Sequence, residues 1–149
     1  MNQIHVEVSD VIEAHAEKIY GILADYREGH PAILPKPYFT EVKVEQGGQG
    51  AGTMARVRMK VMGKEMVYRQ VVSEPEPGRV LREVDTTAGV ATTFTVEPLN
   101  GGGRSRVTIA TDAAVSSGVT GWLERLFNPI VMRRIYRQEL QQLAEYVRR

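Results

Sequence analysis

The chain has 149 residues, and 19 Lys and Arg balance 18 Asp and Glu to leave a formal net charge of +1, which favours neither nucleic acid nor a membrane surface as a partner. Apolar residues make up 42% and charged residues 25% of the composition, which is ordinary for a globular protein, and the length predicts one domain over residues 1–149. Cysteine is absent, which excludes disulfides and cysteine-based sites, and no apolar stretch is long enough for an integral membrane segment, so we expect a cytoplasmic protein.

The first predicted elements are a strand and a helix. Apolar and polar residues alternate over 4–12, which predicts a half-buried strand. The following stretch EAHAEKIYGILADY places Ile19, Ile22 and Leu23 at helical spacing. Prolines in REGHPAILPKPY then predict that this helix ends in a short turn or loop.

Residues 39–114 alternate in polarity almost throughout, and turn signals divide them. The breaks are QGGQGAG, MGKE, EPEPGR, TAG and NGGGR. Short runs of alternating polarity between glycine-rich turns are typical of antiparallel strands joined by short loops. This segment therefore predicts six strands in a meander.

One hairpin within the meander, residues 54–72, has an apolar face and a basic face. With Gly63-Lys64 as a two-residue loop, the predicted pairs on the apolar face are Met59 with Tyr68, Val57 with Gln70 and Val61 with Met66. Arg58 then faces Arg69 on the basic face. Because like charges directly opposite are destabilising, we expect this face to meet solvent or acidic residues of a neighbouring strand.

A second hairpin is predicted around a four-residue loop at 100–103. Its outer face pairs Glu97 with Arg106, which have opposite charges. Its inner face pairs Val96 with Val107, Phe94 with Ile109 and Thr92 with Thr111. Two such hairpins predict a sheet with one solvated face and one face that another element must cover.

The C-terminal tail offers the covering element. Its apolar residues form two helical stripes that are out of phase: Val119, Trp122, Leu123, Leu126, Phe127 and Ile130, then Met132, Ile135, Tyr136, Leu140, Leu143 and Val147. The phase changes at Asn128-Pro129, where Asn suits a helix N-cap and Pro the first helical position. We therefore expect a short helix, a break or kink, and a long final helix with a solvated basic face.

The order of these elements and their local sequences resemble the START-like helix-grip (SRPBCC) superfamily. IYGILADYREGHPAILP is similar to its first-helix signature, and VVSEPEPGRVL, TTFTVEPLNGGGRSRVTI and FNPIVMRRIYRQELQQLAEYV fit its later strands and final helix. The nearest branch is the polyketide cyclase/dehydrase-like one, and ubiquinone-binding members are related to it. The resemblance implies an α+β fold in which a curved seven-stranded antiparallel sheet wraps around a long C-terminal helix, with two short helices after the first strand. It also implies an apolar cavity that binds a lipid, a polyketide or another hydrophobic molecule.

The apolar face of residues 54–72 admits two interpretations, a filled core or a cavity wall. Met adapts its shape to variable contents, and the polar tips of Tyr68 and Gln70 could orient a ligand. In a filled core the same tips would bond to backbone or water. With the resemblance, the cavity is favoured, and the candidate ligand-binding residues are Tyr26, Tyr38, Val57, Met59, Met66, Tyr68, Gln70, Phe94, Ile109, Trp122, Leu126 and Ile130.

Catalytic chemistry has a weak signature in this sequence. His5, His15 and His30 lack metal-ligand spacing, so we expect no metal, and no cofactor motif occurs. His30 is of interest because the family places the segment after the first helix at the cavity mouth. We assign no catalytic residue, although Tyr68, Gln70, Tyr26, Tyr38 and His30 are the candidates for moving a proton.

Three classes of function therefore stay open. The leading hypothesis is binding or transport of a hydrophobic small molecule. The alternatives are a polyketide cyclase or dehydratase that uses the same cavity, and a protein-interaction module. A closed apolar cavity favours the first, converging acid and base groups inside it favour the second, and a flat apolar surface patch favours the third.

Overall fold

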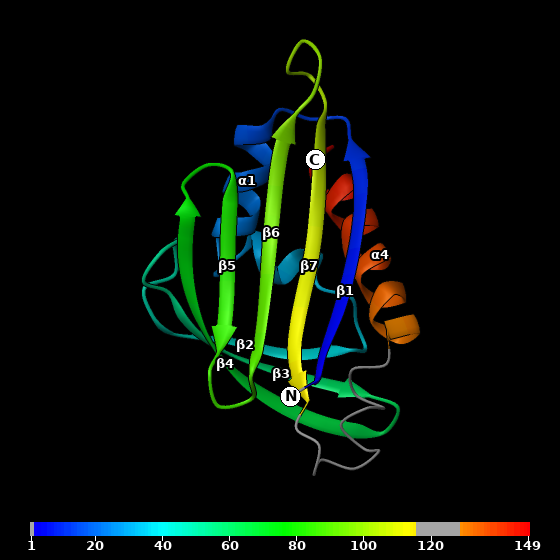
Figure 1. The fold of residues 1–149 in the computed structure, drawn as a ribbon. Coiled ribbons are helices and arrows are strands. Elements are labelled where there is room, and N and C mark those ends of the chain that lie inside the picture. The colour runs from blue at the N-terminus through cyan, green and yellow to red at the C-terminus, as the bar shows by residue number, and fades with distance from the viewer. Residues whose placement is uncertain (1, 116–128) are drawn as a thin grey trace.

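The computed structural model describes residues 2–115 and 129–149 as a curved antiparallel sheet that wraps around helices (Figure 1). Its elements are β1 (Asn2–Ile12), α1 (Ala16–Ala24), α2 (Gly29–Ile33), β2 (Phe39–Gln46), β3 (Met54–Val61), β4 (Lys64–Glu76), β5 (Val80–Asp85), β6 (Val90–Pro98), β7 (Ser105–Val115) and α4 (Pro129–Tyr146). The 7-stranded sheet has the order β1-β7-β6-β5-β4-β3-β2. In Figure 1 the strands β5, β6, β7 and β1 run nearly upright, β2, β3 and the first part of β4 cross beneath them, and β4 then bends upward beside β5. This is the predicted helix-grip architecture.

The second hairpin, β6 and β7, has the predicted register. Glu97 pairs with Arg106, and the inner pairs are Val96–Val107, Phe94–Ile109 and Thr92–Thr111. The loop closes through the Leu99 N–H, which donates to the Arg104 carbonyl at 2.8 Å. All six inner residues are at most 8% exposed, so this face forms part of the core.

The predicted loop of the first hairpin, β3 and β4, is wrong. Val61 pairs with Lys64, so the loop is Met62-Gly63 and not Gly63-Lys64. Both loop residues have positive φ, 51° at Met62 and 78° at Gly63, as a type I′ turn requires. The predicted cross-strand pairs are replaced by Val57–Tyr68, Met59–Met66, Val61–Lys64 and Arg56–Arg69.

The predicted faces of this hairpin are nevertheless confirmed. The true register differs by two residues along one strand, and a shift of two keeps every side chain on its own face. Val57, Tyr68 and Gln70 are buried, whereas the Arg58 side chain lies on the outer face. Arg58 pairs there with Glu65 at 2.6 Å and with Glu41 of β2 at 3.8 Å. These acids offset the repulsion expected on the basic face.

The helices cover the inner face. The α1 residues Ile19 and Leu23 are fully buried, as their spacing predicts. The proline-rich stretch, expected from the residues to be a turn or loop, contains the five-residue helix α2, which agrees with the two short helices implied by the resemblance. None of the helices that the structure describes is long and apolar enough to cross a membrane.

Helix α4 packs against β1, and its predicted buried stripe is confirmed. Met132, Ile135, Tyr136, Leu140, Leu143 and Val147 are each at most 6% exposed. Arg134 and Arg137 lie on the opposite, exposed face. The predicted short helix before it, its break at Asn128 and the candidates Trp122 and Leu126 lie outside the described residues.

Candidate functional site

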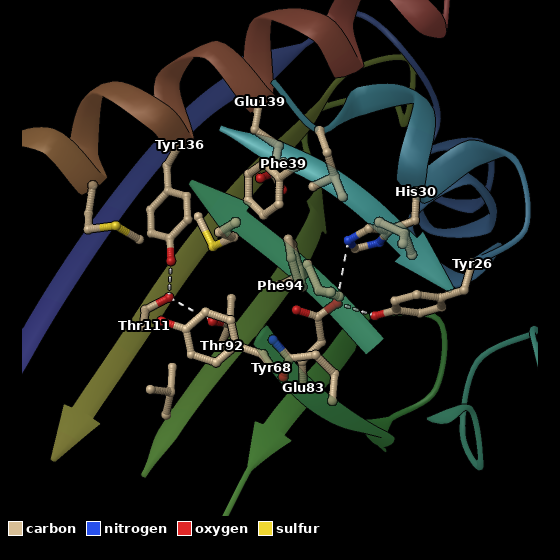
Figure 2. A pocket seen from close by; sticks show the side chains of 17 residues that line it. Tyr26, His30, Phe39, Tyr68, Glu83, Thr92, Phe94, Thr111, Tyr136 and Glu139 are labelled. Carbon is tan, nitrogen blue, oxygen red and sulfur yellow. Dashed lines mark hydrogen bonds and ion pairs between the residues drawn. The ribbon is translucent and has the colours of Figure 1, made fainter. Parts of the chain in front are cut away.

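A pocket lies between the inner face of the sheet, helix α2 and helix α4 (Figure 2). Its walls are mostly apolar or aromatic. Six of the predicted ligand-binding residues line it: Tyr26, Val57, Met59, Tyr68, Gln70 and Phe94. The remaining lining residues were not among the ligand-binding candidates: His30, Leu34, Phe39, Val42, Glu83, Val90, Thr92, Thr111, Met132, Tyr136 and Glu139.

Four other predicted ligand-binding residues do not line the pocket. Ile109 is packed within the core, and Tyr38 and Met66 lie against the core from outside. Ile130 is 68% exposed and does not line the pocket, and the other members of its predicted apolar stripe lie outside the described residues. The physical reason is helical phase, because Ile130 precedes Met132 by two residues, or about 200° around α4.

The free volume of the pocket is small. It is about 60 Å³, room for a few water molecules, whereas pockets for drug-sized ligands have roughly 300–1,000 Å³. A second hollow of about 190 Å³ lies on the other side of Leu34, Phe39 and Val42, which line both spaces. These three residues therefore border both the pocket and an outer groove, and an organic ligand larger than the free volume requires side chains to move.

One end of the pocket holds a buried cluster of His30, Tyr26 and Glu83. The His30 ring stacks on Tyr26 with 4.5 Å between ring centroids and contacts Phe94 edge-on at 5.2 Å. The Tyr26 hydroxyl donates to Glu83 Oε2 at 2.5 Å, and His30 Nε2 lies 3.4 Å from the same oxygen. His30 Nδ1 lies 2.7 Å from the Leu23 carbonyl, and because a carbonyl only accepts, Nδ1 carries a proton. The other ring nitrogen, Nε2, faces the Glu83 carboxyl.

The turn between α1 and α2 places His30 in this cluster. The Asp25 carboxylate accepts hydrogen bonds from the backbone N–H groups of Arg27, Glu28 and Gly29, at 3.1 to 3.3 Å. Gly29 passes so close to α1 that an added Cβ would lie 2.7 Å from the Ile22 carbonyl oxygen. This tight turn directs the His30 side chain inward, where it is 3% exposed.

The other end of the pocket holds a chain of hydroxyl groups. Thr92 and Thr111 share a hydrogen bond of 2.7 Å, and Thr111 is also hydrogen-bonded to the Tyr136 hydroxyl of α4. Figure 2 shows this chain crossing from the sheet to the helix. Burial raises the pKa of Tyr136, so its hydroxyl stays protonated at neutral pH.

Two further tyrosines of the pocket stay neutral for the same reason. Burial raises the pKa of Tyr26 well above its ordinary value, and the neighbouring Glu83 carboxylate raises it further. Burial is also the main cause that raises the pKa of Tyr68, and the nearby Tyr136 and Asp85 raise it further. Both hydroxyls therefore stay protonated, and Tyr26 donates to Glu83 while Tyr68 donates to the Met66 sulfur at 3.2 Å.

Glu139 projects from α4 into the pocket, and sequence reasoning missed both Glu139 and Glu83. Glu139 is 2% exposed, and its Oε2 has no hydrogen-bond partner among the described residues. Burial, followed by the charge of Glu83, raises the pKa of Glu139 well above its ordinary value. Helical phase could have found it, because position 139 follows the buried positions 132, 135 and 136. Strand alternation from Leu81 likewise points Glu83 inward.

The polar side chains of the pocket lie within a mostly apolar and aromatic wall. Within residues 2–115 and 129–149, no group of three His, Asp or Glu side chains could hold a metal ion. The pocket instead combines an apolar wall with a histidine, two carboxyl groups and several hydroxyl groups. Such a lining can bind an apolar molecule and orient its polar groups.

Comparison with known proteins agrees with this description. The chain matches, over residues 3–148, the family described as polyketide cyclase/dehydrase and lipid transport. Among solved structures it is similar to the KanY protein, with 27% identity, 100% of each chain covered and a TM-score of 0.85. No curated protein matches the chain.

Two more distant structures share the fold. The Zhui aromatase/cyclase from Streptomyces sp. R1128 has 19% identity over 99% of this chain and 95% of that one, with a TM-score of 0.75. A START superfamily protein from Mycobacterium smegmatis has 18% identity over 96% of this chain and 93% of that one, with a TM-score of 0.63. The family match over residues 3–148 confirms the predicted polyketide cyclase/dehydrase-like branch of the START-like superfamily, and these two structures share its helix-grip fold.

Proposed function

The chain belongs to the polyketide cyclase/dehydrase and lipid transport family, and we propose that it binds a hydrophobic small molecule between its sheet and helix α4. The observation that carries the proposal is the buried apolar pocket with unpartnered polar atoms. Gln70 and Glu139 both line it, and Gln70 Oε1 and Glu139 Oε2 are buried without a hydrogen-bond partner among the described residues. Buried polar groups normally have hydrogen-bond partners. A ligand that bonds to these atoms would therefore gain affinity and be held in a defined orientation.

Ligand entry requires the pocket to widen beyond its free volume of about 60 Å³. Met59 and Met132 line opposite walls, one on β3 and one on α4. Methionine has an unbranched, flexible side chain that can repack around variable contents. Phe39, which also borders the outer groove, would move to open a path from that groove to the pocket.

Native mass spectrometry of the purified protein tests the proposal by detecting a co-purified hydrophobic molecule. Calorimetric titration with a fatty alcohol, a flavonoid and a quinone analogue complements it. For any of these ligands that binds, we expect Met59→Ala to change the affinity of the protein for it by about tenfold, or about 1.4 kcal/mol. The control Lys60→Ala changes the exposed neighbour of Met59 on the same strand and should leave affinity unaltered. The proposal is refuted if native mass spectrometry detects no bound molecule and none of the three ligand classes binds saturably.

The second candidate function is catalysis of a polyketide cyclisation or dehydration, and the His30–Glu83–Tyr26 cluster favours it. The His30 imidazole nitrogen and the Tyr26 phenol converge on one oxygen of the Glu83 carboxyl in a buried site. In such a site, His30 and Glu83 can pass a proton to or from a bound carbonyl compound, and the pocket walls can hold its chain in a reactive fold.

A linear poly-β-ketone thioester, with the cyclised product followed by mass spectrometry, tests this candidate. His30→Gln should lower turnover by roughly 10²–10⁴-fold, the usual contribution of a general acid or base. Affinity for an unreactive analogue should stay within about threefold, because the apolar walls are unchanged. Product formation no faster than the spontaneous reaction would reject catalysis and leave binding standing.

A further inference from the structure

The ionisable side chains that line the pocket are mostly acidic. Glu83 and Glu139 contribute two carboxyl groups, whereas no lysine or arginine of the described residues lines the pocket. His30 is the basic side chain present among those lining residues, and its ring already lies against the Leu23 carbonyl and Glu83. A negatively charged ligand group would therefore meet acidic neighbours without a free cation to offset them.

Unpartnered polar atoms add to this asymmetry. Glu139 Oε2 and Gln70 Oε1 are buried oxygens with no donor among the described residues. Figure 2 shows Glu139 extending from α4 towards the space above Glu83. Because burial and Glu83 raise its pKa, the Glu139 carboxyl is held neutral while no cation is near.

Building on the proposed function, we infer that the pocket selects hydrophobic molecules with a hydrogen-bond-donating, basic nitrogen over neutral ones, and neutral ones over carboxylates. An ammonium group donates to the free oxygen of Glu139 and favours the ionised form of that carboxyl. A hydroxyl group can donate one hydrogen bond but adds no charge attraction. A carboxylate brings a further negative charge close to Glu83 in a site of low dielectric constant, where charge interactions are strong.

Benzylamine, benzyl alcohol and benzoate test the inference, because they share one small ring and differ in charge at neutral pH. Protein-observed NMR measures their dissociation constants and suits weak binding. We expect benzylamine to bind about tenfold more tightly than benzyl alcohol, and benzoate to bind more weakly than either. In Glu139→Gln the preference for benzylamine over benzyl alcohol should fall below about threefold.

Glu145→Gln is the matched control. It makes the same substitution at an exposed position of the same helix, away from the pocket, so the wild-type preference should persist. If benzyl alcohol binds and benzylamine or benzoate binds equally well, the inference is overturned while the proposed function stands. If none of the three ligands binds, the inference fails, and native mass spectrometry with the titrations of larger ligands decides the proposed function separately. The wild-type series decides the charge preference even where Glu139→Gln does not fold.

Discussion

The Tyr26 hydroxyl donates a hydrogen bond of 2.5 Å to Oε2 of Glu83, and this contact joins the segment after α1 to strand β5. Both residues are buried, at 2% and 7% exposure, so neither polar group can turn to water. The contact therefore links the stability of the fold to the geometry of the pocket.

Tyr26→Phe should lower the free energy of unfolding by about 1–3 kcal/mol, because it leaves a buried carboxyl with one donor fewer. Urea denaturation measures the change. Tyr146→Phe, at a half-buried position of α4, should stay within about 0.5 kcal/mol of wild type. Equal losses in the two variants would show that the Glu83 contact is not what stabilises the fold.

Glu139→Gln should make stability less dependent on pH. The folded-state pKa of Glu139 is raised above its ordinary value of 4.5, first by burial and then by Glu83. Its contribution to stability is therefore fully present below that ordinary value and is lost as pH rises through the folded-state pKa. At about pH 8 the variant should be more stable than wild type by roughly 1–3 kcal/mol, and the gap should narrow towards about pH 5.

Urea titrations at several pH values measure this gap. Tyr26, His30, Glu83 and Tyr136 face the same pocket, and they are unchanged in the variant. A difference between variant and wild type that stays constant over the whole range would contradict the assigned state of Glu139.

The turn of the first hairpin predicts two opposite effects. Met62 has φ of 51° and is 65% exposed, so Met62→Asn should raise the free energy of unfolding by about 0.5–1 kcal/mol, since Asn tolerates this backbone region. Gly63→Ala should lower it by roughly 1 kcal/mol or more, because φ is 78° there. Thermal unfolding of both variants checks the pair, and a stabilised Gly63→Ala would refute the type I′ turn.

Thr111→Val should destabilise the fold by about 1–3 kcal/mol, because the Thr92 and Tyr136 hydroxyls both lose their partner. Thr108→Val in the same strand is the control, since Thr108 is half-buried and lies on the other face of the sheet. We expect the control to change stability by less than about 0.5 kcal/mol in denaturant titrations. A larger loss at Thr108 would contradict the assigned hydrogen-bond chain.

The two hairpins show what sequence can and cannot fix. The second hairpin was predicted correctly because its charged pair, Glu97 and Arg106, and its apolar pairs agree on one register. In the first hairpin, Gly63 fits the second position of a type I′ loop as well as the first position of a type II′ loop. Sequence alone could not choose between them, but alternation still assigned each side chain to the correct face.

The candidate site was predicted in part for a similar reason. Period-2 alternation identified Met59, Tyr68 and Phe94 as inward-facing, and the structure places all three in the pocket. Glu83 and Glu139 were in phase with buried neighbours, yet their convergence depends on how α4 packs across the sheet. The free volume of about 60 Å³ is likewise a property of three-dimensional packing that no periodicity encodes.

Binding inside the pocket is tested most directly by methionine-methyl NMR during titration with benzyl alcohol. Met59 and Met132 line the pocket, whereas Met54 and Met62 are 36% and 65% exposed and lie outside it. We predict saturable shifts of the Met59 and Met132 methyl signals, with those of Met54 and Met62 unchanged. Signals of Met59 and Met132 that stay fixed, or shifts confined to Met54 and Met62, would contradict ligand binding in the pocket.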